Sequence, residues 1–177
     1  MGNVGSKPME TRKINGFPWY TVDEYGNVFN TRTNVRVQQT RRANHMSVML
    51  RKPNSPFQYP SWVHRLVAKA FLRNPRPDLF IEVDHIDGNE YNNHVSNLRW
   101  LNRQLNSLNS CALGCSFNKN HKKWRAYLHL NGKKHSLGYF NTFLEAHRKY
   151  LTAREIQFNR MYTRLVSDGP PQMDFLP

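Results

Sequence analysis

The order of apolar and polar positions predicts short β-strands in the first third of the chain. In the range 19–29, large apolar side chains lie on both sides of Gly26-Asn27, a dipeptide typical of tight hairpin turns. They are Trp19, Tyr20, Val22 and Tyr25 before it and Val28 and Phe29 after it. The ranges 34–39 and 45–50 predict a second pair of short strands, with two arginines in the loop between them. This part of the chain is therefore expected to be a small β-module.

A helix is predicted over residues 61–72, because the apolar positions there repeat at helical spacing. Ser61 is placed to cap its start, and Asn74-Pro75 is expected to end it. The positions that form the apolar stripe are Val63, Leu66, Val67, Ala70 and Phe71. We expect this stripe to be buried in the core.

The segment 83–106 is rich in Asn, Asp and Gly and lies between apolar positions. The pattern predicts a strand over 80–85, a polar loop, a second strand over 98–101 and a helix through Asn106. This ββα arrangement places Asp84 and His85 together on the first strand.

The last third predicts three strands followed by a helix. Residues 123–130 alternate, Asn131-Gly132 is a strong hairpin signal, and residues 133–140 return as the next strand. The sequence 142–145 is a capping box that opens a helix. In the alternating strand, one set of side chains packs on that helix and the other set faces outward.

Charge narrows the choice of partners. The chain of 177 residues has a net charge of +14, with 15 basic and 8 acidic residues up to Ser110 and 11 and 4 after it, so each part carries +7. An even positive charge favours contact with a long phosphate backbone, although a basic protein with no such partner has the same composition.

The two cysteines are too few for a disulfide scaffold and lack the paired spacing of a zinc site, so we expect a reduced intracellular protein without structural zinc. No apolar run is long enough to span a membrane.

Asp84 and His85 have the chemistry of a hydrolytic site. A neutral imidazole accepts a proton from water near neutral pH, and a neighbouring carboxylate holds a hard cation. The alternative is that the polar residues of this segment only form turns. We accept that alternative for the loop residues Asp87, Gly88, Asn89, Asn92 and Asn93.

The spacing resembles that of the phage-type HNH homing endonucleases. Eleven residues separate His85 from Asn97, and eight more separate Asn97 from Asn106. The resemblance implies a ββα-metal core in which His85 is the general base and Asn97 fixes the loop and orients His85. It also implies that Asp84 and Asn106 hold one Mg²⁺ or Mn²⁺ ion.

The last third, in the order GCSF, WRAYL and GKKHSLGYFNT, resembles the AP2 DNA-binding domain, whose open sheet face enters the major groove. The residues expected to contact DNA from this face are Arg125, Tyr127, His129, Lys134 and Ser136. The contacts expected from the rest of the chain are Arg41, Arg42, His64, Arg99 and Arg103.

The chain is thus expected to be an α+β protein. Its expected parts are a flexible tail over 1–13, the β-module over 14–60, the nuclease core over 61–110, the AP2-like unit over 111–160 and a tail over 161–177.

The predicted function is a metal-dependent endonuclease acting on double-stranded DNA and leaving 5′-phosphate and 3′-hydroxyl ends. We expect a monomer, encoded by a phage or virus and active in the host cell. The alternatives are a DNA-binding regulator with an inert core and, less favoured, an RNA-binding protein. Nicking and double-strand cutting are both open.

Overall fold

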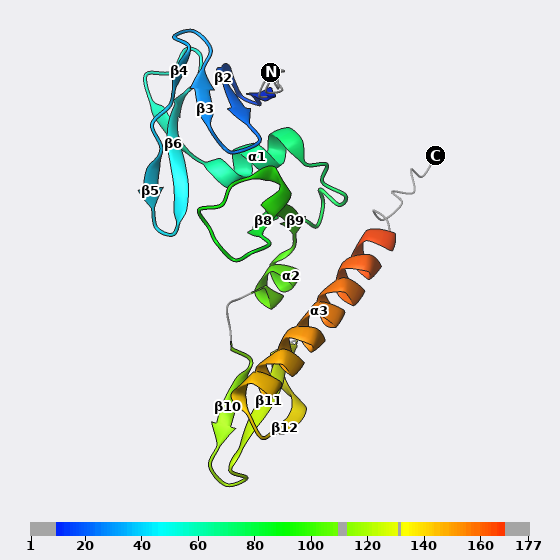
Figure 1. Cartoon of the computed structure of the whole chain (residues 1–177). Coiled ribbons are helices and arrows are strands. Elements are labelled where there is room, and N and C mark those ends of the chain that lie inside the picture. Colours follow the sequence, from blue (N-terminus) through cyan, green and yellow to red (C-terminus); the bar gives the residue numbers. More distant parts are fainter. Residues whose placement is uncertain (1–9, 110–112, 131, 169–177) are drawn as a thin grey trace, which may run out of the picture. The chain divides into compact units, whose positions relative to one another are not determined.

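The structure, a computed structural model, describes residues 10–109, 113–130 and 132–168 (Figure 1). The fold is mixed α+β, with several small sheets. The chain divides into two compact units, Met1–Asn102 and Arg103–Pro177, and each is described by itself below. The division falls within the range expected for the nuclease core.

The first unit begins with two small antiparallel sheets. The first sheet has the order β1 (Thr11–Ile14), β2 (Phe17–Asp23), β3 (Val28–Asn30) and β4 (Val35–Arg36). The second contains β5 (Thr40–Arg42), β6 (His45–Arg51) and β7 (Gln58–Trp62).

The β2–β3 hairpin confirms the turn expected at Gly26-Asn27. Two expectations are corrected. Residues 11–14 pair with β2 and so do not belong to a tail, and Arg41 and Arg42 lie on strand β5 and not in a loop.

The turn between β2 and β3 is closed by a buried carboxylate. Asp23 accepts hydrogen bonds from the backbone of Tyr25 at 2.9 Å and of Asn27 at 2.7 Å, and from the Asn27 side chain at 2.7 Å. Gly26 has a φ of +87°, a conformation that glycine adopts without steric cost. A Cβ atom on Gly26 would lie 2.8 Å from Cγ1 of Val63 and 3.1 Å from Cβ of Asn93.

The substitution Gly26→Ala is therefore expected to destabilise the first unit. Gly16→Ala is a matched control, because Gly16 also has a positive φ, +79°, but a Cβ there meets nothing within 4 Å. Both variants place alanine at a positive φ, which costs conformational free energy. Only Gly26→Ala also overpacks its surroundings, at a cost of about 1–3 kcal/mol. Urea unfolding of the three proteins measures the difference. Equal losses in the two variants would contradict the close packing of this turn.

Helix α1 (Val63–Phe71) follows β7 directly and buries Val63, Leu66 and Val67, as the apolar stripe predicted. The expected cap is wrong. Ser61 pairs with Val48 inside the sheet, and the helix starts after Trp62 without a side-chain cap. Residues 58–62 satisfy their backbone groups by pairing with β6, and this pairing delays the helix.

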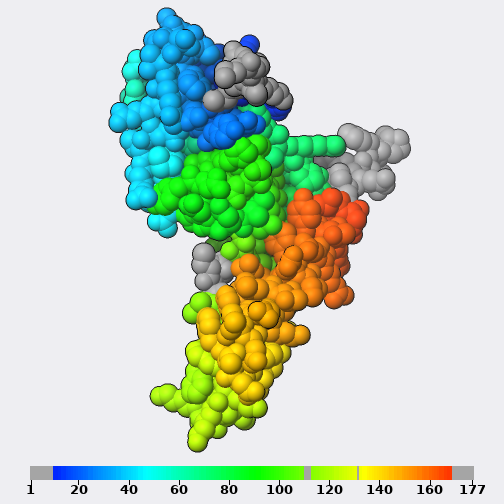
Figure 2. Space-filling model, viewed as in Figure 1, coloured from blue at the N-terminus to red at the C-terminus, as the bar shows by residue number. Residues whose placement is uncertain are grey.

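Strands β8 (Glu82–His85) and β9 (Leu98–Leu101) form an antiparallel pair, which confirms both expected strands of the 83–106 segment. A short 3₁₀ turn, η1 (Val95–Asn97), leads into β9. In the space-filling view, this segment (green) packs directly against the sheets of the same unit (blue to cyan) (Figure 2).

The second unit contains α2 (Arg103–Leu108), the sheet β10 (Cys115–Asn118), β11 (Lys123–Leu130) and β12 (Lys133–Phe140), and the long helix α3 (Phe143–Ser167). The capping box at Thr142 and Glu145 is confirmed. The core of the unit consists of Leu108, Cys115, Ala126, Leu128, Ala146 and Tyr150.

Helix α3 corrects the expected C-terminal tail, because it continues through residues 161–167. The Asn131-Gly132 turn lies partly outside the described residues, while the two strands beside it, β11 and β12, pair as predicted. None of the helices in the described ranges is both long and apolar enough to cross a bilayer.

Candidate active site

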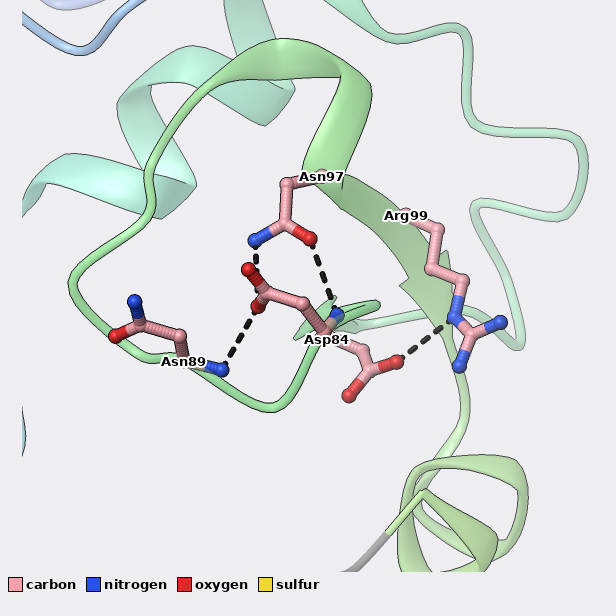
Figure 3. Close-up of polar contacts among 5 residues, drawn as sticks. Asp84, Asn89, Asn97 and Arg99 are labelled. Carbon is pink, nitrogen blue, oxygen red and sulfur yellow. Dashed lines mark hydrogen bonds and ion pairs between the residues drawn. The ribbon is translucent and has the colours of Figure 1, made fainter. Parts of the chain in front are cut away.

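The loop between β8 and β9 is folded around the carboxylate of Asp87. That carboxylate accepts hydrogen bonds from the Asn89 backbone at 2.8 Å and the Asn97 side chain at 2.9 Å (Figure 3). It also accepts one from the Asn92 side chain at 2.8 Å. Hydrogen bonding, above all from the Asn92 side chain and then from the Asn89 backbone, holds the pKa of Asp87 below its usual value. The loop therefore keeps its shape while Asp87 is ionised.

Asn97 fixes this loop, as expected. Its Oδ1 accepts a hydrogen bond from the backbone of Asp87 at 3.1 Å, and its Nδ2 also donates to the carbonyl of Asn92 at 2.8 Å. The expected second task of Asn97, orienting His85, stays a prediction. The His85 ring has a hydrogen bond with another residue of the loop, Asn93, whose Oδ1 is the acceptor.

His85 is the last residue of β8 and only 4% exposed. Its Nε2 lies 3.1 Å from Oδ1 of Asn93, and Nδ2 of Asn93 donates to the carbonyl of Tyr91 at 3.4 Å. Asn93 is itself buried, although the sequence suggested a plain turn residue. The sequence offers one indication of this burial, which is that two asparagines, Asn92 and Asn93, are adjacent. In the structure the Asn92 side chain closes the turn and the Asn93 side chain faces the interior.

Three imidazole rings from three elements lie together. His45 of β6, His64 of α1 and His85 have ring centroids 4.6, 5.2 and 5.9 Å apart. Nδ1 of His45 also lies 3.5 Å from Oε2 of Glu90 in the loop, and burial lowers the pKa of His45, so this contact is an ion pair only when His45 is protonated. His64 was expected to contact DNA, but it is only 6% exposed, and its Nδ1 is buried without a hydrogen-bond partner in the described part of the chain.

Burial, followed by the nearby His45 and His85 rings, lowers the pKa of His64 to about 3. An unfolded chain binds this proton below about pH 6.5 and the folded chain does not, so stability falls as the pH drops from 6.5 toward 3. The expected loss is up to about 1.4 kcal/mol per pH unit. His64→Gln is therefore expected to flatten the pH dependence of urea unfolding between pH 6.5 and 4. Parallel curves for the variant and the wild type would contradict this.

Asp84 lies directly opposite Arg99 in the β8–β9 register. The guanidinium of Arg99 donates through Nε to Oδ2 of Asp84 at 2.7 Å, and Asp84 is only 6% exposed (Figure 3). Arg99, expected to hold the DNA backbone, therefore has a partner within the site. Because Asp84 and His85 end the same strand, both side chains flank one strand terminus.

A carboxylate oxygen at Asp84 suits a hard divalent cation. In the described residues no cluster of three or more His, Cys, Asp or Glu side chains is arranged to hold a metal ion. Asn106, the second expected ligand, lies on α2 in the other unit. Its pairing with Asp84 stays a prediction.

The remaining residues expected to contact DNA are surface residues of both units. Arg41 and Arg42 are exposed on β5, and the Arg41 guanidinium lies 4.1 Å from the centroid of the Tyr91 ring in the loop. In the second unit, Lys134 lies 3.5 Å from the centroid of the Tyr127 ring. Arg103, His129 and Ser136 are exposed, whereas Arg125 is half-buried.

Comparisons with known proteins show what the chain is similar to. The chain is 37% identical over 93 residues to an HNH endonuclease of Acanthamoeba polyphaga mimivirus, covering 52% of this chain and 23% of that protein. It is 46% identical over 52 residues to a protein of Bacillus subtilis named as an SPbeta prophage-derived HNH homing endonuclease, covering 29% of each.

A solved structure described as DNA binding and cleavage by the HNH homing endonuclease I-HmuI superposes with a TM-score of 0.51 at 31% identity, covering 57% of each chain. No model of a known protein family matches the sequence. The chain spans less than a third of the length of the curated relatives given above. The expected resemblance to HNH homing endonucleases is confirmed, and the relatives support a nuclease. The AP2 resemblance stays a prediction.

Proposed function

We propose that this chain, with its likeness to the HNH homing endonucleases, hydrolyses phosphodiester bonds in double-stranded DNA. The observation that carries the proposal is the arrangement of His85. Its ring is buried at the end of β8, and its Nε2 has a hydrogen bond with Oδ1 of Asn93. Asp84, which carries the carboxylate, is the preceding residue in the chain. A base and a cation-binding carboxylate at one strand terminus are the two groups that phosphodiester hydrolysis needs.

His85 would take a proton from the attacking water, a contribution of about 10²–10⁴-fold in rate. Asp84 and Asn106 would hold one Mg²⁺ or Mn²⁺ ion, and both offer the oxygen ligands that these ions prefer. When bound, the ion would neutralise charge on the phosphate and on the leaving 3′ oxygen. The products would carry 5′-phosphate and 3′-hydroxyl ends.

DNA recognition would use both units. In the first unit, Arg41 and Arg42 extend from strand β5, which contacts the active-site loop through Tyr91. In the second, the open face of β11 and β12 would enter the major groove, as in AP2 domains. The net charge of +14 supports contacts along the phosphate backbone. The viral and prophage relatives favour a phage or virus as the source. The protein would act as a monomer in the host cell.

A sequence-specific DNA-binding regulator with an inert core is the second candidate, since the same basic surfaces would serve it. A supercoiled plasmid library with a randomised insert separates the two. The library is incubated with the protein and Mg²⁺, Mn²⁺ or EDTA, and new ends are sequenced. A nuclease gives metal-dependent ends at a shared sequence. Retarded but intact DNA under all three conditions would favour the regulator.

A further inference from the structure

A neutral imidazole carries its proton on one ring nitrogen, and only the other nitrogen can take a proton from water. A general base is therefore effective only when the ring is held in the correct tautomer. In proteins that choice is made by the hydrogen bond at the nitrogen facing away from the reaction. In this chain, Nε2 of His85 has a hydrogen bond with Asn93.

The amide of Asn93 can have only one orientation that satisfies both of its neighbours. Its Nδ2 donates to the carbonyl oxygen of Tyr91 at 3.4 Å, so its Oδ1 lies 3.1 Å from Nε2 of His85. Reversing the amide would bring two oxygens together at Tyr91 with no proton between them. An amide oxygen only accepts hydrogen bonds, so Nε2 of His85 must be the donor.

We infer that Asn93 is a positioning residue that holds neutral His85 in the Nε2-protonated tautomer, which makes Nδ1 the nitrogen that accepts the proton from the attacking water. This inference rests on the proposed function for its catalytic meaning. The tautomer itself follows from the hydrogen bonds alone.

Asn93 is held in place from several sides. Asn93 is 5% exposed, and Gly26 packs closely on it. A Cβ atom added to Gly26 would lie 3.1 Å from the Cβ atom of Asn93. Two residues further on, the backbone of Val95 donates to the carbonyl of Glu24 at 2.8 Å. The turn after β2 therefore positions the residue that selects the tautomer. This gives the N-terminal sheet a direct part in the chemistry of His85.

The direct test is nitrogen-15 NMR of the DNA-free, full-length protein at a pH where the His85 ring is neutral. The protonated and deprotonated ring nitrogens of an imidazole give well-separated signals, and His85→Gln identifies those of His85 among the 8 histidines. We expect a single tautomer with the proton on Nε2. A proton on Nδ1 would overturn the inference.

Two variants separate positioning from folding. Asn93→Ala removes the oxygen that accepts from His85 and is expected to give mixed tautomers. Asn89→Ala removes the bond from the Tyr91 backbone in the same loop, at 3.2 Å, and is expected to leave the His85 signals as in the wild type. Unchanged His85 signals in Asn93→Ala would overturn the inference.

Cleavage kinetics connect the tautomer to catalysis. With DNA mapped as a wild-type target, Asn93→Ala is expected to lower kcat by about 10–100-fold, as when a partner that orients an imidazole is removed. The KM for DNA should stay near the wild-type value. A loss confined to KM would overturn the inference. A wild-type protein that never cuts DNA would contradict the proposed function separately, since the NMR result requires no cleavage.

Discussion

Replacing His85 by alanine is expected to lower the cleavage rate by about 10²–10⁴-fold, the range of general-base contributions. Without the imidazole the attacking water loses its proton acceptor. The neighbouring rings of His45 and His64 belong to β6 and α1, and we do not expect them to take its place. Duplex affinity should change little, because His85 is only 4% exposed and contributes little contact surface. Single-turnover cleavage and gel retardation on the same mapped DNA measure the two effects.

The control for His85→Ala is His85→Gln, because the alanine variant leaves a cavity beside two other rings. Glutamine fills more of that volume but offers no base, so both variants should be equally slow while His85→Gln unfolds closer to the wild type. Cleavage by either variant at the wild-type rate would remove His85 from the mechanism.

Asp84→Asn is expected to reduce cleavage by at least about 10²-fold at moderate Mg²⁺, since a bound cation supplies several kcal/mol of charge stabilisation. The amide can still accept the hydrogen bond from Nε of Arg99, which the carboxylate accepts at 2.7 Å. The fold should therefore survive, and the lost negative charge is the main change.

The dependence of rate on Mg²⁺ concentration at saturating DNA distinguishes a metal ligand from a structural partner. We expect Asp84→Asn to need much more Mg²⁺, with partial recovery of rate at high concentration. Arg99→Gln serves as the comparison, because it also breaks the ion pair but keeps the Asp84 carboxylate. If Asp84→Asn has the Mg²⁺ dependence of the wild type, Asp84 is not a ligand.

Local patterns were sufficient for several elements. Strand β11 alternates clearly, and Thr142 and Glu145 cap the start of α3. The two strands around the loop follow from the apolar residues Val83, Leu98, Trp100 and Leu101. In each case the deciding interactions lie within a few residues of one another, so the sequence predicts them directly.

Other features depend on pairing between distant residues. Residues 11–14 form a strand because β2 lies beside them, and Ser61 is in a sheet because β6 pairs with it. The end of α3 was missed because its last turns carry no clear apolar stripe. In all three, the sequence nearby gave the wrong local preference.

The active site shows the same limit. The spacing of Asp84, His85 and Asn97 predicted the site, but the partner of Asp84 depended on the β8–β9 register, which pairs it with Arg99. Asn93 has the composition of a turn residue, and only the folded loop shows that its amide faces His85. Side-chain direction within a polar loop is not encoded by residue type.

The N-terminal sheets contact the loop between β8 and β9 directly. Glu24 accepts a hydrogen bond from the loop, His45 pairs with Glu90, and Arg41 lies over Tyr91. DNA bound by strand β5 would therefore lie next to the loop that positions His85, which gives recognition and cleavage a shared scaffold.

The most direct test of the central claim is the chemistry of the DNA ends made by the wild-type protein with Mg²⁺. Hydrolysis with water as the nucleophile should leave 5′-phosphate and 3′-hydroxyl groups, so ligase should reseal the products and polymerase should extend them without prior treatment. EDTA should prevent their formation. The contradicting result is a DNA library that contains a bound target, is retarded in a gel and yet remains intact with Mg²⁺ and with Mn²⁺. That result would contradict the nuclease function.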